Sequence, residues 1–147
     1  MIEIEGIPGT SAAHERGMGF NEGLRKYPEI TVVAREAANF DRQEAQKVMH
    51  GILQNDIEFD AVFAHNDNMI MGVIDVLEEM KVQSPRVLIG FDAIPEALQA
   101  VKQGRLTATI AQKPETMGRL ALESAVLFFR GEKPPAITPV ELSLITK

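Results

Sequence analysis

Two hydrophobic periods alternate along this chain. Short apolar runs, typical of strands, lie at 2–6, 30–37, 60–64, 86–91, 107–111 and 139–146. Between them, apolar residues recur at helical spacing and predict helices at 11–27, 41–54, 68–80, 95–104 and 114–130. Right-handed crossovers place such helices on the faces of a parallel sheet. The sequence therefore predicts an α/β fold, a three-layer parallel sheet with helices on both faces.

Two of these helices carry recognisable start signals. Asp41 and Glu44 have the spacing of a capping box ahead of the 41–54 stripe. Asp67 and Asn68 follow the strand at 60–64, and their residue types favour capping of the next helix over contact with a ligand.

Composition and charge exclude several classes of protein. With 147 residues and 45% hydrophobic content, the chain has the size of one globular domain. Its net charge of −6 and scattered Lys and Arg argue against nucleic-acid binding. The absence of cysteine excludes disulfides and thiol nucleophiles. We expect a soluble chain, because it shows neither a signal peptide at its start nor an apolar run of membrane-spanning length.

The residues that could carry catalysis do not form a known motif. The histidines His14, His50 and His65 do not match the spacing of metal ligands. His65 follows a strand, where a lone histidine is more often a loop residue than a catalytic base. "GIPGT" fits neither a dinucleotide fingerprint nor a P-loop and is interpreted as a tight turn. No catalytic residue, metal or cofactor is therefore predicted.

Polar and aromatic side chains gather where four predicted strands end. Asn66 follows the strand at 60–64, and Phe91 with Asp92 ends the strand at 86–91. Gln112 follows the strand at 107–111, and Phe40 lies in the loop after 30–37. Ligands of open parallel sheets bind at the carboxyl ends of the strands, so these side chains are expected to share one site.

Arg16 lies among small and apolar neighbours such as Ala13 and Phe20 on the first predicted helix. A guanidinium in such surroundings needs a partner, because an unpaired buried charge is costly. From the residues alone, two interpretations stay open. Arg16 reaches into the cleft at the strand ends, or it extends along the surface to a nearby acid such as Glu15 or Asp41.

Guanidinium, carboxylate and amide groups can each engage two adjacent hydroxyls, and an aromatic ring suits the C–H face of a sugar. This combination is typical of carbohydrate recognition. The candidate ligand-binding residues are Arg16, Phe40, Asn66, Phe91, Asp92 and Gln112.

Several segments resemble the periplasmic sugar-binding proteins of the ribose-binding type. They include "EGIPGTSAAHERGMGF", "ANFDRQEAQKVM", "DAVFAHNDNMIMG" and "VLIGFDAIPEALQAVKQGRLTATIAQKPETMG", in the same order and spacing, and the ending "PVELSLITK". In that family the positions that match the six candidate residues contact the sugar, which favours the cleft for Arg16. The resemblance implies a non-enzymatic solute receptor of an ABC transporter that binds ribose or a similar monosaccharide, works with a membrane permease and lies in the periplasm.

The resemblance covers only the C-terminal lobe of this two-lobed family. Residues 1–112 and 139–147 are expected to form the core of that lobe, and 113–138 is expected to cross to the missing N-terminal lobe. We therefore expect a truncated form with half of the sugar site. The chain shows no signal peptide, so this form could also be cytoplasmic.

The last predicted helix, 114–130, is apolar on nearly all sides. A helix of this kind expects neighbours on more than one side. Its apolar surface can be covered if it folds back on its own lobe, or if two chains pair. Because two-fold pairing is the commonest solution, we predict a homodimer through this helix.

Two other functional classes stay open at this point. The chain also resembles the effector-binding and dimerisation core of lac-repressor-type transcription regulators. A small flavodoxin-like enzyme that uses Asp92 and His65 is a third interpretation, for which no acid–base pair or phosphate motif is present.

Overall fold

The computed structural model describes residues 1–82 and 87–147, so Arg86, predicted to begin a strand, lies outside the described residues. Helices and strands alternate through these two ranges. The strands are β1 Ile2–Glu5, β2 Ala34–Ala37, β3 Ala61–Ala64, β4 Val87–Asp92, β5 Ala108–Ala111 and β6 Ser143–Thr146. The helices are α1 Ser11–Leu24, α2 Arg42–Gln54, α3 Asp67–Glu79, α4 Pro95–Gln103 and α5 Pro114–Phe129.

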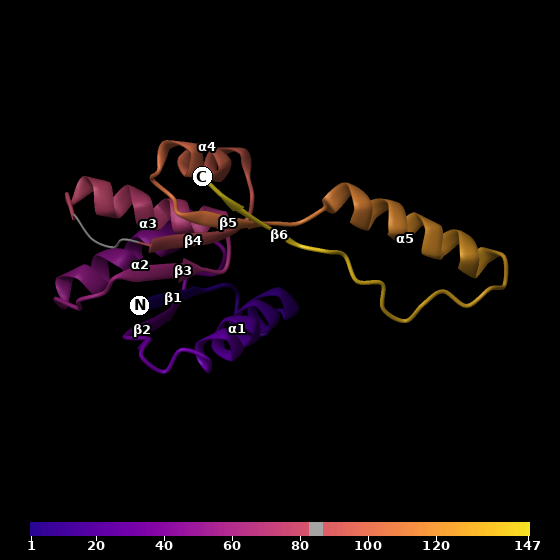
Figure 1. Cartoon of the computed structure of the whole chain (residues 1–147), viewed down its shortest axis with the longest axis horizontal. Coiled ribbons are helices and arrows are strands. Elements are labelled where there is room, and N and C mark those ends of the chain that lie inside the picture. Colours follow the sequence, from indigo (N-terminus) through magenta and orange to yellow (C-terminus); the bar gives the residue numbers. More distant parts are fainter. Residues whose placement is uncertain (83–86) are drawn as a thin grey trace.

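All strands join one sheet in the order β2-β1-β3-β4-β5-β6. β1 to β5 are parallel, as predicted, but β6 pairs antiparallel with β5. The reason is the connection between them. The chain leaves the sheet at the carboxyl end of β5, forms α5, and re-enters at the same edge, so β6 has to run in the opposite direction (Figure 1).

The strand order fixes which face each helix covers. The connection from β1 leads to β2 at one side of the sheet, whereas the connections that follow β2, β3 and β4 all lead toward the other side. Right-handed crossovers therefore place α1 on one face of the sheet and α2, α3 and α4 on the other. Buried residues of α2, α3 and α4 form one hydrophobic cluster with Ile2, Ile4, Val62 and Leu88. On the opposite face, Phe20 of α1 stacks on Phe63 of β3 at 4.9 Å between ring centroids.

The segment between β1 and α1 forms the tight turn that the sequence predicted. The Thr10 amide donates to the carbonyl of Ile7, and Gly9 has a φ of 84°. Glycine suits this position because a type II turn requires a positive φ there. The Thr10 hydroxyl then caps α1 by accepting from the amide of Ala13.

α5 extends away from the rest of the lobe (Figure 1), so this structure does not adopt the fold-back arrangement. Although all of α5 is described, none of its residues is buried. Within residues 1–82 and 87–147, no helix combines the length and apolar character needed to cross a membrane.

The contact between β4 and α3 gives a direct test of the fold. A Cβ at Gly90 would collide with the carboxylate of Asp67 and press on Ile70. We expect Gly90→Ala to lower the free energy of unfolding by about 1–3 kcal/mol, because overpacking forces these neighbours to move. Urea denaturation followed by circular dichroism measures the change.

Gly51→Ala in α2 is the matched control. A Cβ there meets no neighbouring atom. This substitution is expected to raise stability by about 0.5–1 kcal/mol, because alanine suits a helix interior better than glycine. Equal stability of Gly90→Ala and the unmodified chain would contradict the packing of β4 on α3.

Candidate functional site

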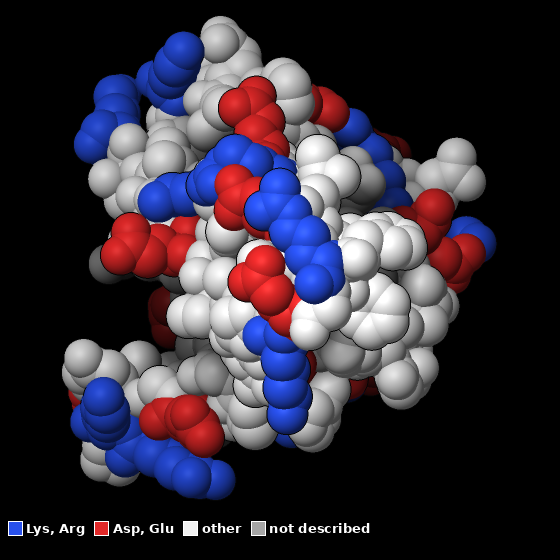
Figure 2. Space-filling view, turned by 90° about the vertical axis from the view of Figure 1, so that its right-hand side faces the viewer, with Lys and Arg blue, Asp and Glu red and all other residues white. Residues whose placement is uncertain are grey.

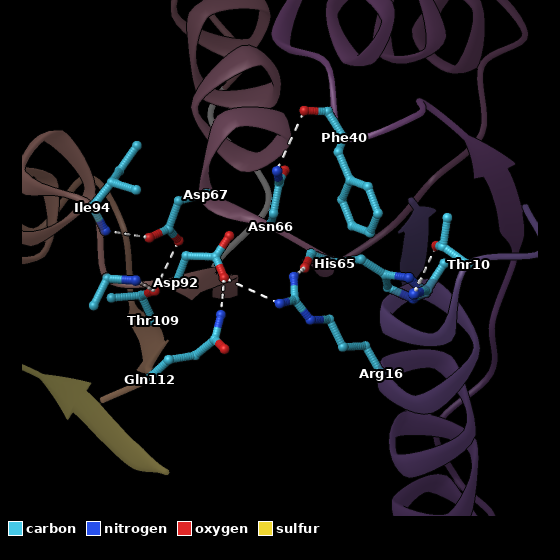
Figure 3. A network of polar contacts seen from close by, with 12 residues as sticks. Thr10, Arg16, Phe40, His65, Asn66, Asp67, Asp92, Ile94, Thr109 and Gln112 are labelled. Atoms are coloured by element: carbon cyan, nitrogen blue, oxygen red, sulfur yellow. Dashed lines mark hydrogen bonds and ion pairs between the residues drawn. The ribbon is translucent and has the colours of Figure 1, made fainter. Parts of the chain in front are cut away.

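Arg16 is the centre of a polar cluster at the carboxyl edge of the sheet (Figure 3). Its Nη1 donates to the carbonyl of His65 at 2.5 Å, and its Nη2 donates to Asp92 Oδ1 at 3.1 Å. The guanidinium also lies over the ring of Phe91, 3.9 Å from the centroid, and 5.7 Å from that of Phe40. Of the two interpretations left open by the sequence, the cleft position is therefore the observed one.

Asp92 joins the ends of β4 and β5. Besides Arg16, its Oδ1 accepts from Gln112 Nε2 at 2.6 Å. Among the described residues, Oδ2 of Asp92 has no hydrogen-bond donor, and the side chain keeps 29% of its surface exposed. One carboxylate oxygen therefore holds the cluster together, while the other is free to accept from a bound molecule.

The loop that carries Asp92 is held in an unusual backbone conformation. Asp92 has a φ of 114° and Ala93 a φ of 56°, both in a region that non-glycine residues rarely occupy. The Ala93 amide donates to the hydroxyl of Thr109, and the Ile94 amide donates to Asp67 Oδ2 at 2.9 Å. Strain of this kind persists only where the surroundings over-determine it, and it is common at functional sites.

Asp67 and Thr109 support the site from beneath, and the sequence did not identify them in this role. The Thr109 hydroxyl donates to Asp67 Oδ1 at 2.8 Å, and both side chains are buried. Burial raises the pKa of Asp67, although the hydrogen bonds from Thr109 and Ile94 partly oppose it. The one feature of the sequence that could have indicated this role is the polar Thr109 within the apolar run at 107–111.

The N-terminal cap of α3 lies one residue before the predicted position. Asn66, not Asp67 or Asn68, caps α3, and its Oδ1 accepts from the amide of Met69 at 3.0 Å. Its Nδ2 donates to the carbonyl of Phe40 at 3.3 Å, which ties the loop after β2 to the end of β3. Asn66 is therefore at the site, but much of its hydrogen-bonding capacity is used within the protein.

Phe40 closes over the first loop of the chain. Its backbone has a φ of 61°, and a Cβ on Gly6 would collide with its ring. Only glycine at position 6 leaves room for Phe40 in this place. The ring is thereby held beside Arg16, at the edge of the polar cluster.

His65 lies between β3 and α3, as expected of a loop residue, and its side chain is buried. Its Nδ1 accepts from the amide of Gly6 at 3.3 Å, so the ring proton is on Nε2, which donates to Glu3 Oε1 at 3.1 Å. Arg35 donates to the other oxygen of Glu3 at 2.6 Å. The ring is thus committed to a structural network, while the carbonyl of the same residue orients Arg16.

The six candidate residues fall into one connected arrangement. Arg16, Asp92 and Gln112 are hydrogen-bonded in series, with Phe91 against the guanidinium. Asn66 and Phe40 lie beside them through their own hydrogen bond. Arg16, Phe91 and Gln112 also line one end of a cavity of about 740 Å³ that continues along the sheet beside α1.

This arrangement offers donors, acceptors and ring faces at the carboxyl edge of the sheet. In the described ranges, no group of three His, Cys, Asp or Glu side chains could hold a metal ion. The chemistry available at the edge is non-covalent recognition of a polar molecule with adjacent hydroxyls.

The buried carboxylate of Glu3 generates a pH-dependent prediction. Burial alone would raise its pKa, but the hydrogen bonds from His65 and Arg35 outweigh this and hold the pKa below its usual 4.5. Glu3 therefore contributes stability above pH 4.5, and this contribution is lost as the pH falls through the lowered pKa. Glu3→Gln is expected to cost about 1–3 kcal/mol at neutral pH and progressively less in acid, as measured by denaturation at several pH values.

Glu123→Gln is the control for this experiment. Glu123 also accepts from an arginine at 2.6 Å, but the ion pair is exposed on α5. Exposed pairs contribute little, so we expect a change below about 1 kcal/mol. A stability difference for Glu3→Gln that stays constant from neutral to acid pH would contradict the described network.

This chain is similar to known proteins in both sequence and structure. The family model described as periplasmic binding protein domain matches residues 1–133. The ribose import binding protein of Escherichia coli is 40% identical over 147 residues, which is 100% of this chain and 49% of that protein. The D-allose-binding periplasmic protein of the same organism is 33% identical over 94% of this chain and 43% of that protein.

Solved structures give the same result. A periplasmic solute binding protein from Actinobacillus succinogenes with bound D-allose superposes with a TM-score of 0.91 at 30% identity, over 99% of this chain and 52% of that one. The Caulobacter myo-inositol binding protein gives 0.89 at 34% identity, over 99% and 50%. The chain spans about half the length of the curated relatives it matches. It belongs to the periplasmic binding protein family, as one lobe related to the ribose-type sugar-binding proteins.

Proposed function

We propose that this chain is the C-terminal lobe, or a truncated form, of the sugar receptor of an ABC transporter, and that it binds a pentose such as ribose without chemical change. The observation that carries the proposal is the hydrogen-bonded series of Arg16, Asp92 and Gln112 beside Phe91 at the carboxyl edge of the sheet. The names of the relatives, a ribose import binding protein and a D-allose-binding protein, support the same class of ligand.

Each side chain has a distinct role in the proposed site. Oδ2 of Asp92, which has no donor among the described residues, accepts from sugar hydroxyls. Arg16 donates to sugar oxygens from a position already fixed by His65 and Asp92. Charged hydrogen bonds of this kind are roughly twice as strong as neutral ones. Phe91 and Phe40 provide apolar surface beside them, and Gln112 and Asn66 add amide groups at the rim.

The lobe provides only half of the contacts in this proposal. Residues 1–112 and 139–147 form the lobe core, and 113–138 is the crossing segment that packs on an N-terminal lobe. The projection of α5 away from the sheet supports this division (Figure 1). Without the second lobe, a sugar at the edge stays open to water on one side, so its affinity for this chain is much reduced.

The alternatives from the sequence are not retained. The relatives described above are sugar receptors, which favours neither the lac-repressor-type regulator nor a flavodoxin-like enzyme. We infer that the chain is not an enzyme. We further infer a periplasmic location, a membrane permease as partner of the complete receptor, and a homodimer of this chain through residues 114–130.

Asp92→Ala tests the site in a two-lobed receptor built by joining an N-terminal lobe to this chain. We expect sugar affinity to fall by about 1.5–3 kcal/mol, because the substitution removes a charged acceptor and leaves Arg16 Nη2 and Gln112 Nε2 without their hydrogen-bond partner. Isothermal titration calorimetry with ribose measures the change. Unchanged affinity would remove Asp92 from the site.

Two controls complete this experiment. Glu44→Gln, which removes an exposed ion pair with Lys47 on α2, should bind as the unmodified receptor does. The isolated 147-residue chain should bind ribose far more weakly than the two-lobed protein. Micromolar binding by the isolated chain would contradict the half-site, and no binding by the two-lobed protein would overturn the sugar assignment.

A further inference from the structure

The imidazole ring of His65 takes no part in the proposed contacts with the sugar. Only 1% of the residue is exposed, so the ring cannot reach a bound molecule. A buried imidazole has to be supplied with hydrogen-bond partners, whereas an apolar side chain would fill the same space without them. The contacts of the ring therefore indicate what it contributes to this edge of the sheet.

The two ring nitrogens connect His65 to β1 and to the loop that follows β1. Nε2 donates to Glu3 Oε1 at 3.1 Å, and Nδ1 accepts from the amide of Gly6 at 3.3 Å. The other oxygen of Glu3 accepts from Arg35 at 2.6 Å. Because Nδ1 has to be an acceptor, this set of partners requires a neutral ring with its proton on Nε2. The ring thus fixes the amide of Gly6 relative to the end of β3.

Gly6 extends this contact to Phe40. The Phe40 ring lies so close to Gly6 that a Cβ there would collide with it. The backbone of Phe40 has a φ of 61°, which a non-glycine residue adopts only where its surroundings hold it. A displacement of Gly6 therefore moves the surface on which the Phe40 ring rests.

The same imidazole ring also packs against α1. A Cβ at Gly17 would lie 3.2 Å from His65 Cε1, closer than an ordinary van der Waals contact, so glycine allows the helix to approach the ring. Arg16 is the preceding residue, and its Nη1 donates to the carbonyl of His65 (Figure 3). The ring therefore determines how far α1, and Arg16 with it, lies from the end of β3.

Surface charge does not account for the position of Arg16. Figure 2 views the molecule from the side on which α5 lies and shows Lys and Arg interspersed with Asp and Glu. A surface of mixed sign produces no strong net field that would favour one position of a guanidinium. Close contacts within the lobe, including the ring of His65 against α1, are what hold Arg16 in place.

We propose that His65 is a positioning residue of the sugar site. Its neutral ring holds Phe40 through Gly6. It holds Arg16 through Gly17, so that both groups are in place before a sugar arrives. This role rests on the proposed function and deepens it, because it concerns the same site. When a smaller fraction of molecules has the binding-competent arrangement, the apparent dissociation constant rises in proportion.

The tautomer of His65 can be tested without any substitution. Nitrogen NMR of the histidine ring distinguishes a protonated ring nitrogen from an unprotonated one. In the unmodified chain at neutral pH, we expect the proton of His65 on Nε2 and none on Nδ1. A proton on Nδ1 would overturn the proposal, because the amide of Gly6 could not then donate to the ring.

His65→Leu tests the ring itself, since it removes both nitrogens and keeps the backbone carbonyl that binds Arg16. Without sugar, we expect shifted NMR signals of the Arg16 guanidinium and of the Asn66 side-chain amide, which binds the carbonyl of Phe40. The side-chain amide of Gln46, which binds Asp75 between α2 and α3, should not change. In a titration of the chain with ribose, the dissociation constant should rise at least about fivefold, as the competent fraction falls.

His65→Gln is the matched rescue. Its amide can accept from Gly6 and donate to Glu3, so we expect its ribose dissociation constant to stay within about threefold of that of the unmodified chain. Ile52→Val, a buried position near the far end of α2, lowers stability without touching the site and should bind ribose as the unmodified chain does. A merely structural His65 predicts the same result for the Leu variant as for Ile52→Val.

The outcomes separate this role from the proposed function. Unchanged Arg16 and Asn66 signals in His65→Leu would overturn the positioning role alone, as would a His65→Gln variant that binds no better than the Leu variant. The ring measurement and His65→Gln do not depend on the folding of His65→Leu. Absence of any ribose shifts in the unmodified chain would overturn the proposed function, and the positioning role with it.

Discussion

The position of the Arg16 guanidinium is the constraint on which the site depends. It joins α1 to the end of β3 through the His65 carbonyl and to the end of β4 through Asp92, which in turn holds Gln112 after β5. An unpaired arginine in this half-buried place would be costly, so its hydrogen bonds favour the arrangement that keeps these strand ends together. The same contacts leave one oxygen of Asp92 open at the edge.

Much of this arrangement follows from the sequence alone. The parallel order of β1 to β5 and the gathering of Asn66, Asp92 and Gln112 at one edge result from the alternation of apolar strands and helices. Both features can be predicted from short stretches of sequence, because the polar residues that end a strand are visible without knowledge of which strands lie next to it. The direction of Arg16 could not be obtained in this way, because its partner Asp92 is far away in the chain; only the family resemblance favoured it.

The errors have a common physical origin in long-range contacts. Asp67 has the residue type of a cap, but Thr109 and the loop after β4 bind its carboxylate, and Asn66 takes the cap. His65 is a loop residue as expected, but its burial and its hydrogen bond to Glu3 were not predicted. β6 is antiparallel to β5 because the segment that contains α5 leaves the sheet and returns to it at the same edge. Each outcome depends on residues distant in sequence, and a one-dimensional pattern does not contain them.

We infer that the carboxyl edge of this lobe is half of a sugar site. The most direct test is a titration of the isotopically labelled chain with D-ribose, followed by NMR of the side-chain amides of Gln112 and Asn66 and the guanidinium of Arg16. We expect saturable shifts at these groups, with a dissociation constant in the millimolar range, which corresponds to a binding free energy of about −4 kcal/mol. We expect no shifts at Gln46, whose side-chain amide binds Asp75 between α2 and α3. Shifts absent from the edge, or equal at Gln46, would contradict a half-site at this edge.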